Sequence, residues 1–183
     1  NEQGQYLGSF HARDRILVVL KSGECYTSDF SDSIHIEENL LRIEKNEPRK
    51  IWTAVYYDAD QKYHYIKRFS IEEDQKRENI LGENPKNELL LLTDTYYPRL
   101  LIGRQEKGGE LRTTEIDVEE FALVKSIRAR GKRIAPYLID QVEELPPLKE
   151  SPVFESEHDE SMAETEEEEA DLFAGQTEDS SNE

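Results

Sequence analysis

The sequence predicts an all-β domain followed by a disordered acidic tail. Short runs rich in β-branched, aromatic and leucine residues recur through residues 1–148, and turn sequences with Gly, Asp, Asn or Pro separate them. Beyond Pro146-Pro147 the composition changes to Glu, Ser, Asp and Thr. Such a segment cannot bury enough apolar surface to offset the entropy of ordering. We therefore place the domain at residues 1–148 and the tail at residues 149–183.

The first half of the domain contains two predicted hairpins, because a turn signal separates two β-prone runs in each case. The segment from 34 to 43 fits either a strand or a helical turn, and Pro48 interrupts the chain after it. The expected elements, in order, are strands at 15–20 and 24–30 around Ser22-Gly23, and strands at 51–57 and 62–69 around Asp58–Asp60.

The second half continues in the same way. Four consecutive leucines predict a buried strand, and Asp117–Phe121 predicts a short irregular or helical link. Further expected elements are a loop at 84–87, strands at 88–93 and 99–104 around a hairpin turn at Asp94–Pro98, a turn at Gly108-Gly109, and strands at 111–116 and 137–145. The three hairpins recur roughly every 35–40 residues. This spacing favours a bladed architecture of about three four-stranded units, although an ordinary β-barrel gives it too.

The charge of the chain is concentrated in the tail. The net charge is −18, but residues 150–183 hold 14 acidic residues and no Lys or Arg. Subtracting these 14 from the 41 acids leaves 27 against 23 bases in residues 1–149. The domain is therefore close to neutral, and the acidity of the whole chain does not exclude a polyanionic partner.

Other bulk features narrow the class of protein. Cys25 is the only cysteine, which excludes an intrachain disulfide framework. No apolar run approaches the length of a membrane span and no signal pattern opens the chain, so we expect no membrane partner. The chain begins at Asn1 and its only methionine is Met162. We therefore expect it to be a piece of a longer polypeptide.

No catalytic or metal-binding constellation is evident. The four histidines are scattered, and His64 reads as a surface residue of a strand. Cys25 reads as packed, and Asp58 and Asp60 as turn-forming residues. No nucleophile elbow and no glycine-rich phosphate loop occurs. We expect no catalytic residue, no metal and no cofactor in this piece.

The stretch from Val124 to Arg133 is the strongest binding signal. It holds five basic residues and no acid, which suits a phosphate backbone, although a solvated strand-turn-strand explains the spacing equally well. The candidate phosphate contacts are Lys125, Arg128, Arg130, Lys132 and Arg133. Secondary candidates, on strands that a bladed fold would align along one rim, are Lys67, Arg68, Arg99 and Arg104. Paired tyrosines such as Tyr56-Tyr57 could stack on bases, but packing is their more frequent role.

Two segments resemble a known family. The run from Val118 to Ile134, followed by Val142-Glu143-Glu144-Leu145-Pro146, is similar to the C-terminal end of the A subunit of bacterial type IIA topoisomerases, particularly the Bacteroidetes-like form. The segment from Asp14 to Glu24, an apolar strand, Lys-x-Gly and another strand, resembles the blade signature of that family. The similar segments span most of residues 10–146.

The resemblance implies a β-pinwheel, a curved array of four-stranded blades along which double-stranded DNA bends. It also implies that the cleavage tyrosine lies in an upstream domain outside this chain, and that the topoisomerase B subunit is a partner through those missing parts. Gyrase subunits carry a Gln-Arg-Arg-Gly-Gly-Lys-Gly box, whereas Arg128–Arg133 has no Gln and one Gly. This departure favours a topoisomerase IV-like role over tight wrapping. The expected location is the bacterial cytoplasm, at the nucleoid, and the isolated domain is expected to be a monomer.

Three further interpretations remain open at this point. A non-catalytic protein-interaction scaffold with an acidic recruitment tail is the main alternative, and it would scatter its bases among acids and show an apolar patch. An enzyme with a β-barrel fold lacks any supporting constellation. The tail itself carries a further hypothesis, because a tethered segment with 14 carboxylates competes with DNA at high effective concentration. Leu172-Phe173 within it reads as a short docking motif or, more simply, as part of a solubilising tail.

Overall fold

The computed structural model describes residues 6–29 and 37–155. The chain divides into two compact units, Asn1–Ser151 and Pro152–Glu183. The predicted disorder of the tail falls, from residue 156 onward, outside the described residues. The first unit carries every helix and strand in the part of the chain that the structure describes, and these form three sheets.

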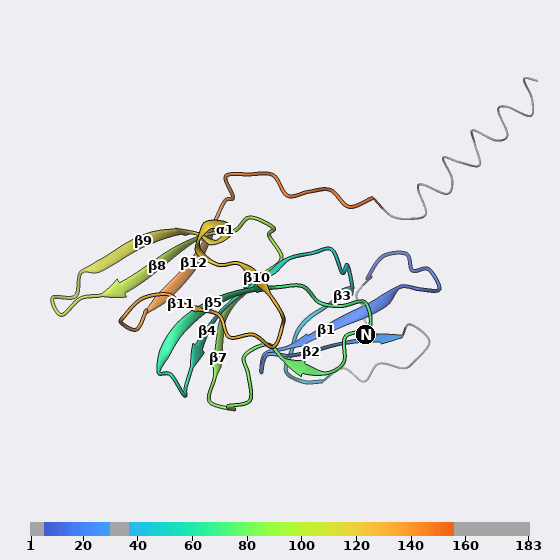
Figure 1. Ribbon diagram of the computed structural model, residues 1–183, viewed down its shortest axis with the longest axis horizontal. Helices are drawn as coiled ribbons and strands as arrows, with labels where there is room; N and C mark the ends of the chain where they lie inside the picture. Colours follow the sequence, from blue (N-terminus) through green and yellow to red (C-terminus); the bar gives the residue numbers. More distant parts are fainter. Residues whose placement is uncertain (1–5, 30–36, 156–183) are drawn as a thin grey trace, which may run out of the picture. The chain divides into compact units, whose positions relative to one another are not determined.

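Each sheet is built around one hairpin (Figure 1). The first has the order β3-β1-β2-β6, with bounds Leu40–Lys45, Arg15–Leu20, Glu24–Asp29 and Glu78–Asn79. The second has the order β10-β5-β4-β7, with bounds Val124–Lys125, Tyr63–Phe69, Trp52–Asp58 and Glu88–Thr93, and β11 (Lys132–Arg133) also pairs with β5. The third has the order β12-β8-β9, with bounds Gln141–Leu145, Arg99–Gln105 and Leu111–Asp117.

The all-β prediction is confirmed, and the helical link is the single turn α1 (Val118–Phe121). Three sheets are present, with four, five and three strands among the described residues rather than four in each. The hairpins at Gly23 and Asp58–Asp60 are also confirmed. Gly23 adopts a φ of +92°, a conformation that suits glycine, and its open Cα face allows Leu81 to approach.

The predicted hairpin at Asp94–Pro98 is wrong. The leucine strand β7 pairs antiparallel with β4, and β8 pairs with β9 and β12 instead. The turn residues from 94 to 98 therefore carry the chain from the second sheet to the third. The hairpin of the third sheet closes at 106–110, where Gly109 donates its N–H to the Glu106 carbonyl at 2.9 Å. The leucines of β7 are half-buried, because this strand lies at the edge of its sheet.

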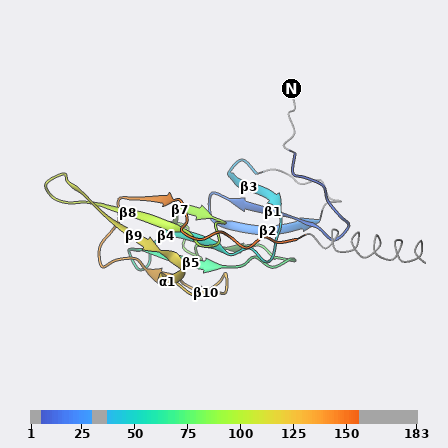
Figure 2. The ribbon, with the colours of Figure 1, turned by 90° about the horizontal axis from the view of Figure 1, so that it is seen from above.

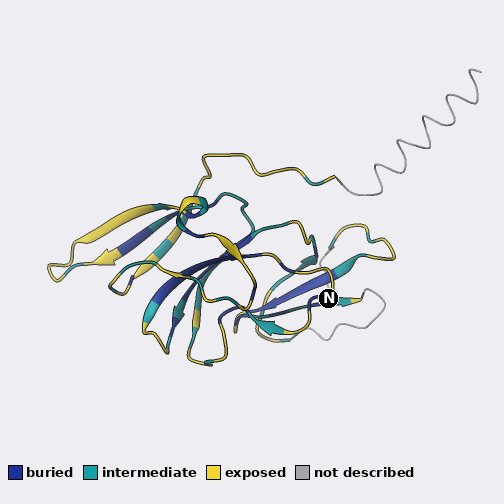
Figure 3. Ribbon diagram, in the orientation of Figure 1, coloured by how far each residue is buried: buried dark blue, intermediate teal, exposed yellow. Residues whose placement is uncertain are grey.

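The second sheet is covered on both faces, which explains why β4 and β5 are buried almost throughout (Figure 3). One apolar cluster joins it to the first sheet and includes Leu17, Trp52 and Phe69. Another joins it to the third sheet and includes Ile66 and Leu100. Figures 1 and 2 both show β4 and β5 between β1–β3 and β8–β9. Polar residues on β5 are therefore inside the protein.

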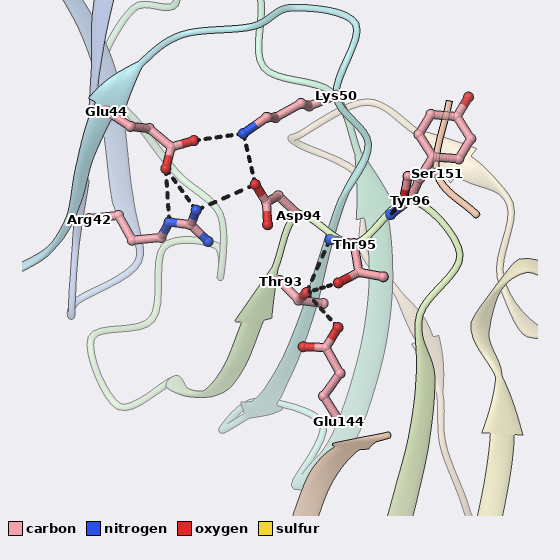
Figure 4. Close-up of polar contacts among 9 residues, drawn as sticks. All are labelled: Arg42, Glu44, Lys50, Thr93, Asp94, Thr95, Tyr96, Glu144 and Ser151. Carbon is pink, nitrogen blue, oxygen red and sulfur yellow. Dashed lines mark hydrogen bonds and ion pairs between the residues drawn. The ribbon is translucent and has the colours of Figure 1, made fainter. Parts of the chain in front are cut away.

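A ring of four charged side chains links the first sheet to the second (Figure 4). Arg42 Nη2 lies 2.7 Å from Glu44 Oε2 and 3.4 Å from Asp94 Oδ2. Lys50 Nζ lies 2.7 Å from Asp94 Oδ2 and 3.1 Å from Glu44 Oε1. Both cations also lie over the ring of Trp52, at 4.7 and 5.7 Å. Alternating charges of this kind satisfy one another without a net local charge.

The third sheet joins the same region through hydroxyl groups. Thr93 Oγ1 donates to Glu144 Oε1 of β12 at 2.8 Å and accepts from the Thr95 N–H at 3.1 Å. The Tyr96 N–H donates to Ser151 Oγ at 3.4 Å. The crossover from β7 to β8 is therefore fixed by polar contacts to two sheets. The polar residues of this segment anchor the crossover and do not reverse the chain into a hairpin.

The charge ring predicts a pH-dependent stability. Burial opposes ionisation of Asp94, but the hydrogen bond from Lys50 and the charges of Lys50 and Arg42 outweigh it and lower the pKa of Asp94 below 3.8. The ionised carboxylate therefore stabilises the fold above about pH 4, and this contribution is lost as the pH falls through the folded-state pKa. We expect Asp94→Asn to lower the unfolding free energy by about 1 kcal/mol at pH 7. Urea denaturation at pH 7 and pH 3 measures the unfolding free energy of the variant and of the unchanged chain. An equal loss at both pH values would show that the ionised Asp94 does not stabilise the fold through this ring.

Candidate nucleic-acid interface

The basic stretch lies along the outer edge of β5. β10 pairs parallel with β5, placing Val124 opposite Arg68, and β11 pairs antiparallel, placing Lys132 opposite Ile66. Residues 126–131 leave the edge between these two short strands and form a turn. The strand-turn-strand expectation is thus correct in outline, but the two strands pair with β5 rather than with each other.

A buried lysine fixes the centre of this turn. Lys67 Nζ donates to the carbonyl of Ile127 at 2.6 Å and to that of Ile80 at 2.7 Å. The side chain of Ile127 itself is buried in the cluster between the first two sheets. The turn is therefore held by its backbone and by an apolar side chain at the same residue.

A second attachment lies at Gly131. Its N–H donates to the hydroxyl of Tyr56 at 3.1 Å. A Cβ at this position would lie 2.4 Å from the carbonyl oxygen of Ile66, a distance that no side chain tolerates. Glycine is required here because the backbone of the turn lies directly against the backbone of β5. The basic turn is thus attached to the core on both sides.

The attachment through Lys67 can be tested by pH. Burial lowers the pKa of Lys67 to about 8, below its value in the unfolded chain. The unfolded state then holds more protons between about pH 8 and 10.5, so this group makes stability rise with pH across that window. We expect Lys67→Met to lose about 1–3 kcal/mol of unfolding free energy, because two carbonyls lose their donor. Urea denaturation should show a larger deficit at pH 10 than at pH 7.5.

Lys107→Met is the control for this experiment, because Lys107 is exposed at the tip of the β8–β9 hairpin. It should leave the unfolding free energy unchanged at both pH values. A deficit in Lys67→Met that does not vary with pH would show that the amine titrates as an ordinary lysine.

The five candidate phosphate contacts are all exposed. They lie on β10 (Lys125), in the turn (Arg128 and Arg130) and on β11 (Lys132 and Arg133). They divide between the two faces of the sheet, because Lys132 contacts the ring of Phe121 at 4.5 Å whereas Arg133 lies over Tyr63 at 4.8 Å. The cations thus surround the turn.

Two of these arginines already have carboxylate partners. Arg128 pairs with Glu78, and its Nε lies 2.9 Å from the carboxylate. Arg130 Nε lies 3.3 Å from Asp58 Oδ2. Within the described part of the chain, Lys125, Lys132 and Arg133 form no ion pair. The carboxylate partners could not be predicted from the sequence, because 41 acids offer too many choices.

Two of the secondary candidates are corrected by the structure. Lys67 and Arg68 are 5% and 6% exposed, because β5 is covered on both faces. Arg68 donates to the carbonyls of Tyr96 at 3.1 Å and Ala122 at 3.4 Å. Both side chains hold the interior of the protein and are not available to a phosphate. The two side chains lie on opposite faces of β5, so the first sheet covers Lys67 and the third sheet covers Arg68.

The other two secondary candidates lie at opposite ends of β8. Arg104 is exposed and lies over the ring of Tyr137 at 4.2 Å, beside the segment that follows β11. Arg99 is half-buried, and its guanidinium lies 3.6 Å from Glu115. Of these two, only Arg104 is exposed, and a single rim that holds all four residues does not form.

Further expectations can be compared with the structure. Tyr56 and Tyr65 are buried and pack against each other, so they do not present rings to a nucleic acid. The surface assignment of His64 is wrong, because its Nδ1 accepts the Ile139 N–H at 3.2 Å inside the protein. Burial lowers the pKa of His64, against the opposing charges of Glu88 and Asp140. Cys25 is packed as expected, and burial raises the pKa of its thiol to about 12.

The described residues contain neither a metal-binding cluster nor a membrane-spanning helix. No group of three or more His, Cys, Asp or Glu side chains there is placed to hold a metal ion. None of the helices in the same residues is long and apolar enough to cross a bilayer.

The fold and the site define an all-β domain with a cationic turn fixed on a sheet edge. Residues 1–146 match the family described as Topoisomerase C-terminal domain, Bacteroidota. The chain belongs to this family, which confirms the resemblance drawn from the sequence. No curated protein and no solved structure matches the chain.

Proposed function

We propose that this chain binds double-stranded DNA without sequence specificity, and bends or steers it for strand passage by a type II topoisomerase. The family gives the chain a topoisomerase role. The observation that carries the proposal is the segment of residues 125–133, which exposes five cations and is attached to the core through Lys67 and Gly131. Cations on a rigid support give affinity and register on a phosphate backbone without reading bases.

The ion pairs within the site favour moderate affinity. A phosphate that contacts Arg128 or Arg130 must displace the carboxylate of Glu78 or Asp58. A phosphate that replaces a carboxylate gains less binding free energy than a phosphate that pairs with a cation lacking a partner. Only three of the five bases lack a carboxylate partner in the described residues, which suits a DNA segment that is held and released. A topoisomerase IV-like role fits this better than tight wrapping.

The proposal extends to the parent subunit and the assembly in which this domain acts. The three sheets form part of a β-pinwheel, and the catalytic domains, with the cleavage tyrosine, belong to the parent subunit outside this chain. The topoisomerase B subunit assembles with that parent, while this domain acts as a monomer without metal or cofactor. A DNA-directed role corresponds to the bacterial cytoplasm, at the nucleoid.

The salt dependence of duplex binding tests the proposal. About 0.9 counterions are released for each phosphate that a base neutralises. The log–log slope of affinity against salt should lie between about −2.7, for the three bases without a carboxylate partner, and about −4.5 for all five. Fluorescence anisotropy with a labelled duplex of random sequence measures the slope. No binding even at low salt would overturn the proposal.

Removal of the acidic tail should strengthen DNA binding. The 14 carboxylates of residues 150–183 are tethered to the domain and compete with phosphates for its cations. We expect residues 1–149 to bind a duplex more tightly than the full chain at low salt, and the difference to shrink as salt screens both interactions. An unchanged affinity after the deletion would exclude this competition.

A protein-interaction role is the second candidate, and one observation favours it. Leu123 is 77% exposed and Val124 is 44% exposed, immediately before the basic turn. Large apolar side chains beside cations offer a surface that a phosphate backbone alone does not use.

A further inference from the structure

A pocket of about 460 Å³ opens beneath the basic turn. It lies where the chain leaves the β5 edge, between Ile66–Arg68 of β5 and residues 120–132. Its size is in the range of sites that hold small ligands or single side chains of a partner.

The lining of the pocket is strongly cationic. Among the described residues that line it, five are basic and Glu120 is the only acid. The five are Lys67, Arg68, Lys125, Arg130 and Lys132. Arg68 is 6% exposed, and its Nε has no hydrogen-bond partner among the described residues. Lys67 and Arg68 already donate to backbone carbonyls, so the exposed cations of the lining are Lys125, Arg130 and Lys132.

The same pocket has apolar walls. Phe121 and Ala122 line it from the cluster between the second and third sheets, and Ala129 lines it from the turn. Leu123 also lines it and is 77% exposed, with Val124 beside it on β10. Cations and exposed apolar side chains therefore meet at one opening.

This combination selects among possible ligands. A free phosphate or a DNA backbone would satisfy the cations and leave Leu123 in water. A purely apolar ligand would leave Lys125 and Lys132 without a counter-charge. An acidic peptide with a bulky apolar residue satisfies both, because the apolar side chain covers Leu123 and the carboxylates reach the cations.

We propose that this pocket docks an acidic peptide segment of a partner protein, with one bulky apolar side chain inserted beside Leu123. The proposal goes beyond DNA binding and stands on separate residues, Phe121, Leu123 and Ala129. Peptide and duplex DNA nevertheless share Lys125, Arg130 and Lys132. A partner with this chemistry therefore displaces DNA from the turn as it binds.

The experiment uses the full chain and a synthetic 12-residue peptide, rich in Asp and Glu, with a central Leu-Phe pair. Anisotropy of the labelled peptide gives its affinity at low salt. Replacing Leu-Phe with Ser-Ser keeps the charge and should weaken binding about tenfold, as expected when one large apolar side chain is no longer buried. Leu123→Ser should weaken the original peptide to the same extent and leave duplex affinity unchanged. Lys125→Ala with Lys132→Ala should weaken both ligands.

A second variant keeps the proposal testable if Leu123→Ser fails to fold. Ala129→Leu fills the pocket from the turn and should abolish the preference for Leu-Phe, while Gly108→Ala on the distant β8–β9 hairpin should change nothing. Equal binding of the Leu-Phe and Ser-Ser peptides would overturn the proposal, since attraction would then be electrostatic only. Displacement of the peptide by inorganic phosphate at equal ionic strength would overturn it too. If the chain binds the peptide through Leu123 but does not bind a duplex, the DNA proposal is overturned and the peptide proposal stands.

Discussion

Replacement of Lys125, Arg128, Arg130, Lys132 and Arg133 by alanine is expected to abolish most of the salt dependence of duplex binding. Each base that contacts a phosphate contributes about −0.9 to the log–log slope, so the slope should become shallower by about 2.7 to 4.5. The affinity at low salt should fall by orders of magnitude for the same reason. Anisotropy titrations of one duplex across a salt series measure both quantities.

A matched control removes three exposed bases elsewhere. Arg13, Arg49 and Lys107 lie before β1, before β4 and at the tip of the β8–β9 hairpin. Their replacement by alanine lowers the net charge but should change the slope by less than about one. Circular dichroism checks that each variant keeps its β structure. An equal loss of slope per base removed in the two variants would mean that DNA responds to overall charge rather than to the turn.

Gly131→Ala is expected to be the most damaging single substitution in the site. The new Cβ would lie 2.4 Å from the Ile66 carbonyl oxygen and 2.8 Å from its carbon, and backbone atoms cannot move aside as a side chain does. The turn must lift, which breaks the pairing of Lys132 with Ile66 and the hydrogen bond to Tyr56. We expect a loss of about 1–3 kcal/mol, which corresponds to a fall in Tm of about 2–12 °C for a domain of this size. Duplex affinity should fall as well, because the cations lose their support.

Gly108→Ala is the matched control for this substitution. No atom lies within 4 Å of a Cβ built at Gly108, and its φ is not in the left-handed region. Its Tm and its duplex affinity should equal those of the unchanged chain. A Tm for Gly131→Ala that matches this control would show that the turn does not lie against β5.

Local signals in the sequence predicted most strands and two hairpins correctly, whereas the strand expected at 137–145 begins only at Gln141. Ser22-Gly23 and Asp58–Asp60 each separate two β-prone runs, so the turn and its strands lie within one short segment. The prediction at Asp94–Pro98 was wrong because turn residues also occur where a chain crosses between sheets. What a strand pairs with depends on distant residues, and local sequence does not contain that information.

The candidate site was predictable in part. Five bases without an acid in ten residues are rarely buried, and all five are exposed. Lys67-Arg68 looked equally suited to a surface, but their strand is covered on both faces and the two side chains bind carbonyls inside. The pocket below the turn had no signal in the sequence, because its walls come from β5 and from residues more than fifty positions later.

The edge of β5 has a consequence for the order of events during synthesis. β4 and β5 leave the ribosome well before residues 124–133, which are the ones that pair with that edge. Until then the nascent hairpin presents unpaired backbone groups and an unfilled gap where Ile127 will lie. We therefore expect closure of this edge to be a late step of folding during synthesis. A chain stalled before residue 124 would lack its cationic turn and expose a strand prone to self-association.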